Sequence, residues 1–204
     1  MAVFPGLPTP HLGAHLTHEA SRDKYDDAEF FLGKIDMPAN VGTYIDSPFH
    51  RFPEREDLSQ LPLERIVGLT GLLMDLSQDG DRELHPELPD HDLEGAAVLI
   101  RTGWDRHWGA DPYFGPAPFL AEAFAVELVD RRVGLVGTDS WNVDDTTTRR
   151  RPIHTMLLDA GIYIVEHLCG LEALPREGFR FSAPVIAVKG GASFPVRAFA
   201  EVES

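Results

Sequence analysis

Two side chains suited to metal binding or acid–base chemistry lie close together in the segment NVGTYIDSPFH, residues 40–50. Asp46 supplies a carboxylate and His50 supplies an imidazole. Ser47 and Pro48 separate them, and a proline restricts the backbone just before it to extended geometry. Such a rigid segment can hold the two groups near each other. Taken alone, however, DSPFH is better explained by a turn-capping aspartate and a surface histidine.

A second pair of such residues lies further along the chain, at His154 and Glu166. His154 falls in the first turn of a predicted helix, and Glu166 directly follows the apolar run IYIV of a predicted strand. Because the chain reverses between the helix and the strand, the two residues can meet at the sheet edge where α/β proteins usually place their sites. A carboxylate so close to a core needs a partner. That partner is either a metal ion or an arginine such as Arg149, Arg150 or Arg151, and the residues alone leave both open.

Asp46, His154 and Glu166 together offer one imidazole and two carboxylates. These groups suit a Zn²⁺ or Mn²⁺ ion. The three residues are therefore a candidate ligand set for one divalent metal ion per chain, zinc or manganese, beside the alternative of an arginine ion pair. His50 would then be left to act as a general acid/base.

The elements that must position these residues alternate between strands and helices. The predicted strands span residues 67–76, 97–102, 134–138, 162–165, 179–188 and 194–202, and the predicted helices span 119–132 and 152–160. Leu120, Phe124 and Leu128 would share one face of the first helix. Pro152 and Gly161 suit the two boundaries of the second. This order predicts one α/β domain over residues 1–204, with a partly parallel sheet and extra strands that form a second sheet or a partial barrel.

The first 40 residues have the least regular pattern. Pro5, Pro8, Pro10 and Gly13 interrupt any periodicity there. We expect an extended, looping entry into the domain.

The composition favours some partners over others. With 204 residues, of which 43% are hydrophobic, the chain fits an ordinary globular domain, and no run approaches the roughly 18 apolar residues of a membrane span. A net charge of -15 repels phosphate backbones, so we expect a small-molecule substrate and no nucleic-acid or membrane partner. The single cysteine, Cys169, cannot form an internal disulfide, and the start MAVFPGLPTP lacks the pattern of a secretory signal. We therefore expect a cytoplasmic location.

Residues 40–50 match the pattern H-x-G-T-H-x-D-x-P-x-H except at Asn40 and Tyr44. The pattern is the hallmark of the putative cyclase family, which includes bacterial kynurenine formamidase and isatin hydrolase, and the chain resembles this family. Other similar segments, in family order, are IRTGWDRHW (100–108), VGLVGTDSWNVDD (133–145) and HTMLLDAGIYIVEHL (154–168). The resemblance thus runs over most of the chain.

The resemblance implies a three-layer β/β/α fold of the swivelling-domain type, with a mixed sheet and a partial barrel. It implies hydrolysis of the C–N bond of a small amide or lactam, as in arylformamidases of tryptophan catabolism, by a homodimer or higher homo-oligomer. Asp46 matches the carboxylate that can bridge two metals, and His154 and Glu166 match the other ligands of the second metal. His50 matches the histidine proposed as acid/base.

Asn40 and Tyr44 stand where the first metal site of the family has histidines. An amide carbonyl is a poor Zn²⁺ ligand, and a phenol must first lose a proton with an ordinary pKa of about 10. We therefore expect the first site to be lost, or left to a harder ion that prefers oxygen. The ligands of the second metal site, Asp46, His154 and Glu166, are all present.

Three functions stay open on the sequence. The one we favour is metal-dependent hydrolysis with His50 as acid/base. The second is a metal-free hydrolase or lyase, in which Asn40 and Tyr44 donate hydrogen bonds to a developing oxyanion and Tyr44 is catalytic. The third is a small-molecule-binding protein with a degenerate site.

Other residues give weaker signals. Trp104 and Trp108 can line a pocket for a flat substrate, although core packing or an oligomer contact explains them as well. Asp139 and Asp144 can orient site groups, although loop capping is the simpler interpretation. His167 is expected to be an ordinary polar position.

Overall fold

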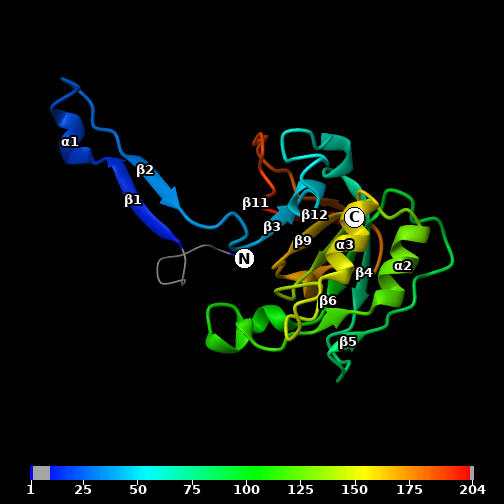
Figure 1. Cartoon of the computed structure of the whole chain (residues 1–204). Coiled ribbons are helices and arrows are strands. Elements are labelled where there is room, and N and C mark those ends of the chain that lie inside the picture. The colour runs from blue at the N-terminus through cyan, green and yellow to red at the C-terminus, as the bar shows by residue number, and fades with distance from the viewer. Residues whose placement is uncertain (2–9, 203–204) are drawn as a thin grey trace.

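The computed structural model describes Met1 and residues 10–202. Within these residues, the largest unit is an eight-stranded mixed sheet in the order β11-β3-β9-β8-β6-β4-β10-β12 (Figure 1). Its inner strands, which run parallel, are β4 (Leu69–Asp75), β6 (Ala97–Arg101), β8 (Leu135–Thr138) and β9 (Tyr163–Glu166). The predicted α/β class and partly parallel sheet are therefore confirmed.

The outer strands are antiparallel to their neighbours, and they show that the sheet curls. They are β3 (Tyr44–Asp46), β10 (Phe179–Ser182), β11 (Ser193–Pro195) and β12 (Phe199–Val202). β11 and β12 lie at opposite ends of the strand order, yet only residues 196–198 connect them. So short a connection requires the two edges to approach each other, which is the predicted partial barrel.

The strand predicted over residues 194–202 is therefore wrong as one element, because the chain passes from one sheet edge to the other inside it. The Val196 amide still donates to the Thr43 carbonyl at 2.9 Å, in continuation of the β11–β3 register, before the chain crosses to the other edge. The strand predicted over 179–188 is too long. It ends at Ser182, shortly before Pro184, which has no amide hydrogen for a ladder.

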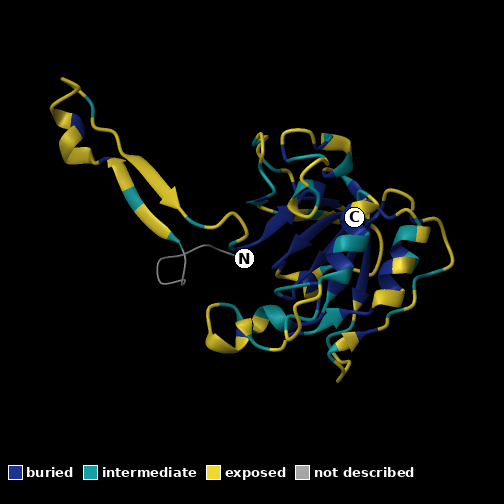
Figure 2. Ribbon diagram, viewed as in Figure 1, coloured by how far each residue is buried: buried dark blue, intermediate teal, exposed yellow. Residues whose placement is uncertain are grey.

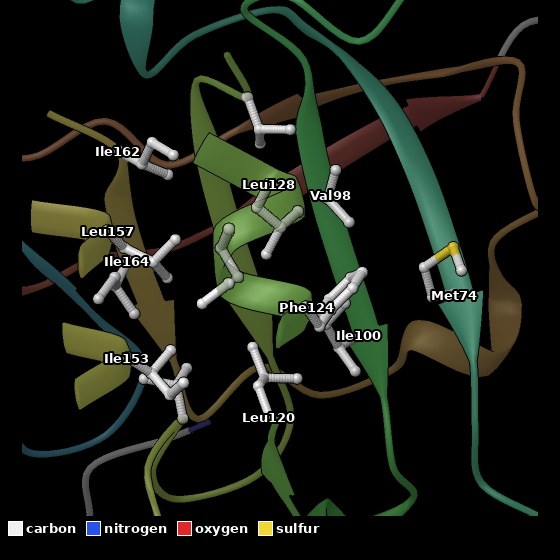
Figure 3. Close-up of a cluster of buried hydrophobic side chains, with 14 of the residues drawn as sticks. Met74, Val98, Ile100, Leu120, Phe124, Leu128, Ile153, Leu157, Ile162 and Ile164 are labelled. Atoms are coloured by element: carbon white, nitrogen blue, oxygen red, sulfur yellow. The ribbon is translucent and has the colours of Figure 1, made fainter. Parts of the chain in front are cut away.

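Helices α2 (Glu122–Asp130) and α3 (Pro152–Asp159) cover one face of the sheet. Val98 and Ile100 of β6 point toward these helices and pack in a buried cluster with Phe124, Leu128 and Leu157 (Figure 3). Their strand neighbours Ala97 and Leu99 belong to a second cluster on the opposite face. Burial on both faces explains why the inner strands are apolar at nearly every position.

The first predicted helix begins later than expected. Phe119–Leu120 forms the short strand β7, which pairs with β5 (Glu83–Leu84), and α2 starts only at Glu122. The amide of Leu120 donates to the Val143 carbonyl at 2.9 Å, so it is already used outside a helix. Phe124 and Leu128 are buried as predicted.

An antiparallel hairpin extends away from the sheet (Figure 1). It consists of β1 (His11–Leu16), α1 (His18–Arg22) and β2 (Leu32–Asp36), and we call residues 11–36 the β-arm. Most of its residues are exposed (Figure 2). The expectation of an irregular first 40 residues is wrong for this segment, while Pro5 and Pro8 lie outside the described residues.

The remaining helical elements are single 3₁₀ turns. They are η1 (Pro48–His50), η2 (Leu63–Arg65), η3 (Trp104–His107), η4 (Asp111–Phe114) and η5 (Leu171–Ala173). Within the part of the chain that the structure describes, no helix has the length and apolar character needed to cross a membrane.

Candidate active site

Pairing of β3 with β9 brings three of the predicted site residues onto one face of the sheet. Tyr44 lies directly opposite Glu166 in this antiparallel pair, and Asp46 lies opposite Ile164. Because side chains alternate along a strand, Tyr44 and Asp46 point to the same side as Glu166. Ile45, between them, packs in the cluster on the opposite face.

Helix α3 adds His154 from its first turn. The Asp144 carboxylate accepts hydrogen bonds from the amides of Ile153 (2.8 Å) and His154 (3.2 Å), which caps the helix. The same carboxylate lies 2.7 Å from Nδ1 of the His154 ring. This contact directs the opposite nitrogen, Nε2, toward Asp46 Oδ2 and Glu166 Oε1, each 3.7 Å away.

His50 approaches the same place from η1. Its Nδ1 lies 3.8 Å from Asp46 Oδ1 and 3.3 Å from Ser193 Oγ. Its side chain is 39% exposed, against 7% for His154, so His50 is the site imidazole that solvent reaches. Ligand atoms of Asp46, His50 and His154 all lie within 4.8 Å of one another. This group contains His50 in place of Glu166, so the geometry offers two overlapping ligand sets.

The site concentrates negative charge away from water. Burial is the main cause that raises the pKa of Glu166, to about 7, with Asp46 adding to the effect and His154 opposing it. Burial lowers the pKa of His154, but the hydrogen bond to Asp144 and the nearby carboxylates of Asp46 and Glu166 outweigh it and raise that pKa to about 10. A positive charge among these carboxylates is therefore strongly favoured.

A divalent cation fits this donor set. Asp46 Oδ2 is buried and has no hydrogen-bond partner among the described residues. Its other oxygen, Oδ1, accepts a hydrogen bond from Ser193 Oγ, which fixes the carboxylate. A buried carboxylate oxygen without a partner is costly. Facing Nε2 of His154, it is a suitable ligand atom for Zn²⁺ or Mn²⁺.

Of the two residues that depart from the family motif, Tyr44 contacts this cluster directly. The Tyr44 hydroxyl donates a hydrogen bond to Glu166 Oε2. Burial and then the charges of Glu166 and Asp46 hold the pKa of Tyr44 well above its ordinary value, so the phenol stays protonated. Within the described residues, the partners of Glu166 are Tyr44, the Val143 amide (2.8 Å) and His154, and no arginine is among them. Asn40 lies nearby in the wall of a pocket.

This pocket has a volume of about 400 Å³. Its lining residues are largely aromatic or apolar and comprise Pro38, Asn40, Val41, Gly42, Tyr44, Trp108, Phe114, Trp141, Asn142 and His167. Of the two predicted tryptophans, Trp108 lines the pocket and Trp104 does not, because the Trp104 indole donates to the Tyr113 carbonyl at 2.9 Å. Tyr44 connects the pocket to the cluster, since its ring lines the one and its hydroxyl bonds to the other.

Several site residues gave little or no sequence signal. Ser193 reaches Asp46 only because β11 pairs with β3, across 147 positions of sequence. His167 has a left-handed backbone (φ 59), which is rare for residues other than glycine, and its ring packs against Tyr44 and Trp108. Asp144 combines both suggested roles, capping and orientation. Asp139 only caps a loop, accepting from the amides of residues 102 and 103.

Comparisons with known proteins identify the relatives of this chain. A model of the putative cyclase family matches residues 10–145. Kynurenine formamidase of Bacillus cytotoxicus (strain DSM 22905 / CIP 110041 / 391-98 / NVH 391-98) is 29% identical over 199 residues, which cover 97% of this chain and 90% of that protein. Kynurenine formamidase of Salinibacter ruber (strain DSM 13855 / M31) is 30% identical over 206 residues, with coverage of 97% and 90%.

Two solved structures share the fold. An isatin hydrolase bound to the product analogue thioisatinate superposes with a TM-score of 0.80 and 19% identity, covering 100% of this chain and 87% of that one. A potential metal-dependent hydrolase with cyclase activity superposes with a TM-score of 0.70 and 26% identity, covering 97% and 90%. The match to the family model, which spans both the hallmark segment and the loop that carries Asp144, shows that the chain belongs to the putative cyclase family.

Proposed function

We propose that the chain is a metal-dependent hydrolase of the C–N bond in a small aromatic amide or lactam. The observation that carries the proposal is the convergence of Asp46, His154 and Glu166. His154 Nε2 faces one oxygen of each carboxylate at 3.7 Å, and the oxygen of Asp46 has no other partner among the described residues. The kynurenine formamidase relatives support the bond class.

The metal is one zinc or manganese ion per chain, held by Asp46, His154 and Glu166. When bound, it would supply a Lewis acid for the carbonyl oxygen and favour ionisation of a water molecule. Asp144 holds the His154 ring so that Nε2 faces the ion position. Ser193 holds Asp46 through Oδ1 and leaves Oδ2 free.

His50 is the acid/base in this proposal. It lies at the solvent side of the cluster, within 3.3 Å of Ser193 and 3.8 Å of Asp46. An exposed imidazole can accept a proton from the attacking water and return it to the leaving nitrogen, and solvent can re-equilibrate it. The alternative role for His50 is metal binding, because its ring also lies close enough to Asp46 and His154 to share an ion with them.

The aromatic pocket supports a planar substrate. A volume of about 400 Å³ lies in the range typical of small-molecule sites. Trp108, Phe114 and Trp141 offer ring faces and edges for an aryl group. An aryl amide seated there would place its carbonyl carbon near Tyr44 and the cluster, in keeping with an arylformamidase-like role in tryptophan catabolism.

Tyr44 takes a positioning role in this proposal, and Asn40 lines the substrate pocket. A phenol has one O–H to donate, and in this structure Tyr44 directs it to Glu166. The metal-free alternative needs that same donor for an oxyanion. Tyr44 is therefore better suited to hold Glu166 in place than to bind the substrate oxygen.

The test combines metal content with turnover. We expect about one zinc or manganese per chain by inductively coupled plasma mass spectrometry, and its loss in Glu166→Gln and His154→Ala. We expect hydrolysis of N-formylkynurenine or isatin that chelator abolishes and added metal restores. Turnover that survives exhaustive chelation would favour the metal-free enzyme. Absence of turnover in a metal-loaded, folded protein would favour a binding protein.

We further propose a cytoplasmic homo-oligomer. A cytoplasmic location is consistent with a single, exposed cysteine and hence no internal disulfide. The homo-oligomer is supported by the exposed apolar side chains of the β-arm.

A further inference from the structure

Asn142 lies in the wall of the aromatic pocket, and its carboxamide is held at one end only. Its Oδ1 accepts a hydrogen bond from the Asp144 amide at 2.9 Å. Because a backbone amide can only donate, the atom that faces it must be the oxygen. The nitrogen, Nδ2, therefore points away from this bond, and the orientation of the carboxamide is defined.

The NH₂ group of Asn142 is free to bind a ligand. It has no hydrogen-bond partner among the described residues. Within that part of the chain, the buried side-chain atoms without a partner are Asp46 Oδ2, the Tyr113 hydroxyl and His167 Nδ1, so Asn142 Nδ2 is open to solvent. Asn142 is half-buried and lines the pocket of about 400 Å³. Its two donor hydrogens are therefore available where a substrate would bind.

Other polar side chains of this wall are committed elsewhere or are not oriented. The Tyr44 hydroxyl donates to Glu166, and the Trp141 indole donates to a backbone carbonyl at 3.0 Å. Asn40 is exposed, and among the described residues no hydrogen bond fixes its carboxamide. Asn142 differs from these three in offering a donor that is both uncommitted and oriented, as a specific binding group must be.

Asn142 is also next to the residues that hold the metal-ligand cluster. The Val143 amide donates to Glu166 Oε1 at 2.8 Å, and the Asp144 carboxylate lies 2.7 Å from Nδ1 of His154. Consecutive Cα atoms are about 3.8 Å apart, so Asn142 belongs to the same short segment of wall. A group bound by Asn142 would therefore lie close to the carbonyl carbon on which the cluster acts.

A carboxamide NH₂ recognises an oxygen acceptor on the substrate. The acceptor could be a carboxylate or a neutral carbonyl. Asp46, Asp144 and Glu166 already place three carboxyl groups at this end of the pocket, and a further negative charge beside them is unfavourable. A neutral carbonyl fits better. On an aryl amide, the ring position closest to the amide nitrogen is the ortho position.

We infer that Asn142 is a specificity-determining residue that binds a neutral carbonyl oxygen carried ortho to the amide nitrogen of an aryl amide. The inference rests on the proposed function and narrows its substrate class from aryl amides to those with a second carbonyl group. Asn142 contacts the substrate and takes no part in cleavage of the C–N bond. A site with a hydrogen-bond donor for one substrate group discriminates against the analogue that lacks the group.

The test uses two probes that differ at one atom, ortho-acetylformanilide and ortho-isopropenylformanilide, in which CH₂ replaces the ketone oxygen. The ratio of their kcat/KM values gives the ketone preference of the metal-loaded protein. Asn142→Asp keeps the oxygen that accepts from the Asp144 amide but loses the donor, and Asn142→Ala loses both. We expect the preference to fall by about 3- to 10-fold in Asn142→Ala, and at least as far in Asn142→Asp.

A matched control separates recognition from charge and from folding. Gln78→Glu makes the same amide-to-carboxylate change at an exposed position and should keep the wild-type preference. Circular dichroism and metal content check that fold and cluster are retained. A purely structural role of Asn142 would slow the hydrolysis of both probes equally and leave the ratio unchanged. Intrinsic differences in reactivity between the probes are common to all variants, so they do not affect the comparison.

Binding is measured in the same samples, so that the test does not depend on turnover. Trp108 and Trp141 line the pocket, and their fluorescence immediately after mixing gives the dissociation constant of each probe. If neither probe is hydrolysed but the binding preference falls in both Asn142 variants, the proposed hydrolysis fails while recognition by Asn142 stands. An unchanged preference in both variants would overturn the role of Asn142 and leave the proposed function intact. A wild type that neither binds nor hydrolyses the ketone at about 1 mM would overturn it as well.

Discussion

Tyr44 and Glu166 face each other across the antiparallel pair of β3 and β9, and the Tyr44 hydroxyl donates a hydrogen bond to the Glu166 carboxylate. Tyr44 occupies a position that the family motif assigns to a histidine of the first metal site. In the metal site proposed here, that position would instead serve Glu166, whose carboxylate it holds. The substitution would then replace a metal ligand with a group that positions another ligand.

This relationship predicts that the first site can be rebuilt. The variant Asn40→His/Tyr44→His restores two imidazoles beside Asp46, a carboxylate able to bridge two ions. We expect the metal content to rise from about one to about two ions per chain, because neutral imidazole is a far better ligand than amide or phenol. Mass spectrometry of the metal-reconstituted protein measures it. Tyr44→Phe is the control and should stay near one, and a folded double variant that also stays near one would refute the idea.

The role of His50 can be decided by separating metal content from turnover. If His50 is the acid/base, His50→Ala should keep its metal and lose about 10²- to 10⁴-fold in kcat. If it is instead a ligand with Asp46 and His154, the ion should be lost together with activity. We expect the first result, since the His50 side chain is 39% exposed and can exchange protons with solvent. His85→Ala, at another exposed histidine, should change neither quantity.

Asp144 is expected to act through His154. In Asp144→Asn the contact to His154 Nδ1 and the cap of α3 are both weakened. Metal affinity should fall by roughly 10- to 100-fold. Stability of the metal-free protein should fall by about 1 kcal/mol through the weaker cap. Competition with a chelator and urea unfolding measure the two effects, and Asp145→Asn, next along the chain, should leave metal affinity unchanged.

His167 offers a test of pocket specificity. A left-handed backbone at a non-glycine residue costs roughly 1–2 kcal/mol, so His167→Gly relieves strain while it deletes a ring from the pocket wall. We expect KM for an aryl amide to rise several-fold with little loss of stability. His167→Asn, which tolerates the same backbone, should show the same rise in KM. An unchanged KM in both variants would remove His167 from the substrate site.

The sequence was most informative where chemistry and periodicity coincide. The inner strands are buried on both faces, so their apolar runs at 97–102 and 134–138 were predicted nearly to their ends. Pro152 and Gly161 bounded α3 for local reasons, a proline in the first turn and a glycine with φ 74 after the end. Such signals depend only on neighbouring residues.

Long-range pairing is what the sequence could not supply. The run 194–202 reads as one strand, and only the curl of the sheet divides it between two edges. Ser193 contacts Asp46 because β11 pairs with β3 at one edge of the sheet, and no local sequence pattern predicts this pairing. The β-arm was missed although Leu12, Ala14 and Leu16 alternate along β1, because β2 (LGKID) shows no clear alternation that would identify its partner strand.

Proton release should accompany metal binding. Burial opposes the charged His154 ring, but Asp144, Asp46 and Glu166 raise its pKa to about 10 in the metal-free chain. His154 therefore carries a proton near pH 7.5, and an imidazole must be neutral to bind a metal ion. Calorimetry in two buffers of different ionisation enthalpy should show about one proton released per ion, and affinity should increase with pH up to about 10.

The stability of the metal-free chain should have the opposite pH dependence. Its raised folded-state pKa means that charged His154 contributes stability fully below the unfolded value of about 6.5, and that this contribution is lost as pH rises toward about 10. The metal-loaded chain has no such proton to lose, so the difference between the two melting temperatures should widen over this range. If the melting temperatures of the two forms kept a constant difference across this pH range, and metal binding released no proton, the ion would have to lie away from His154.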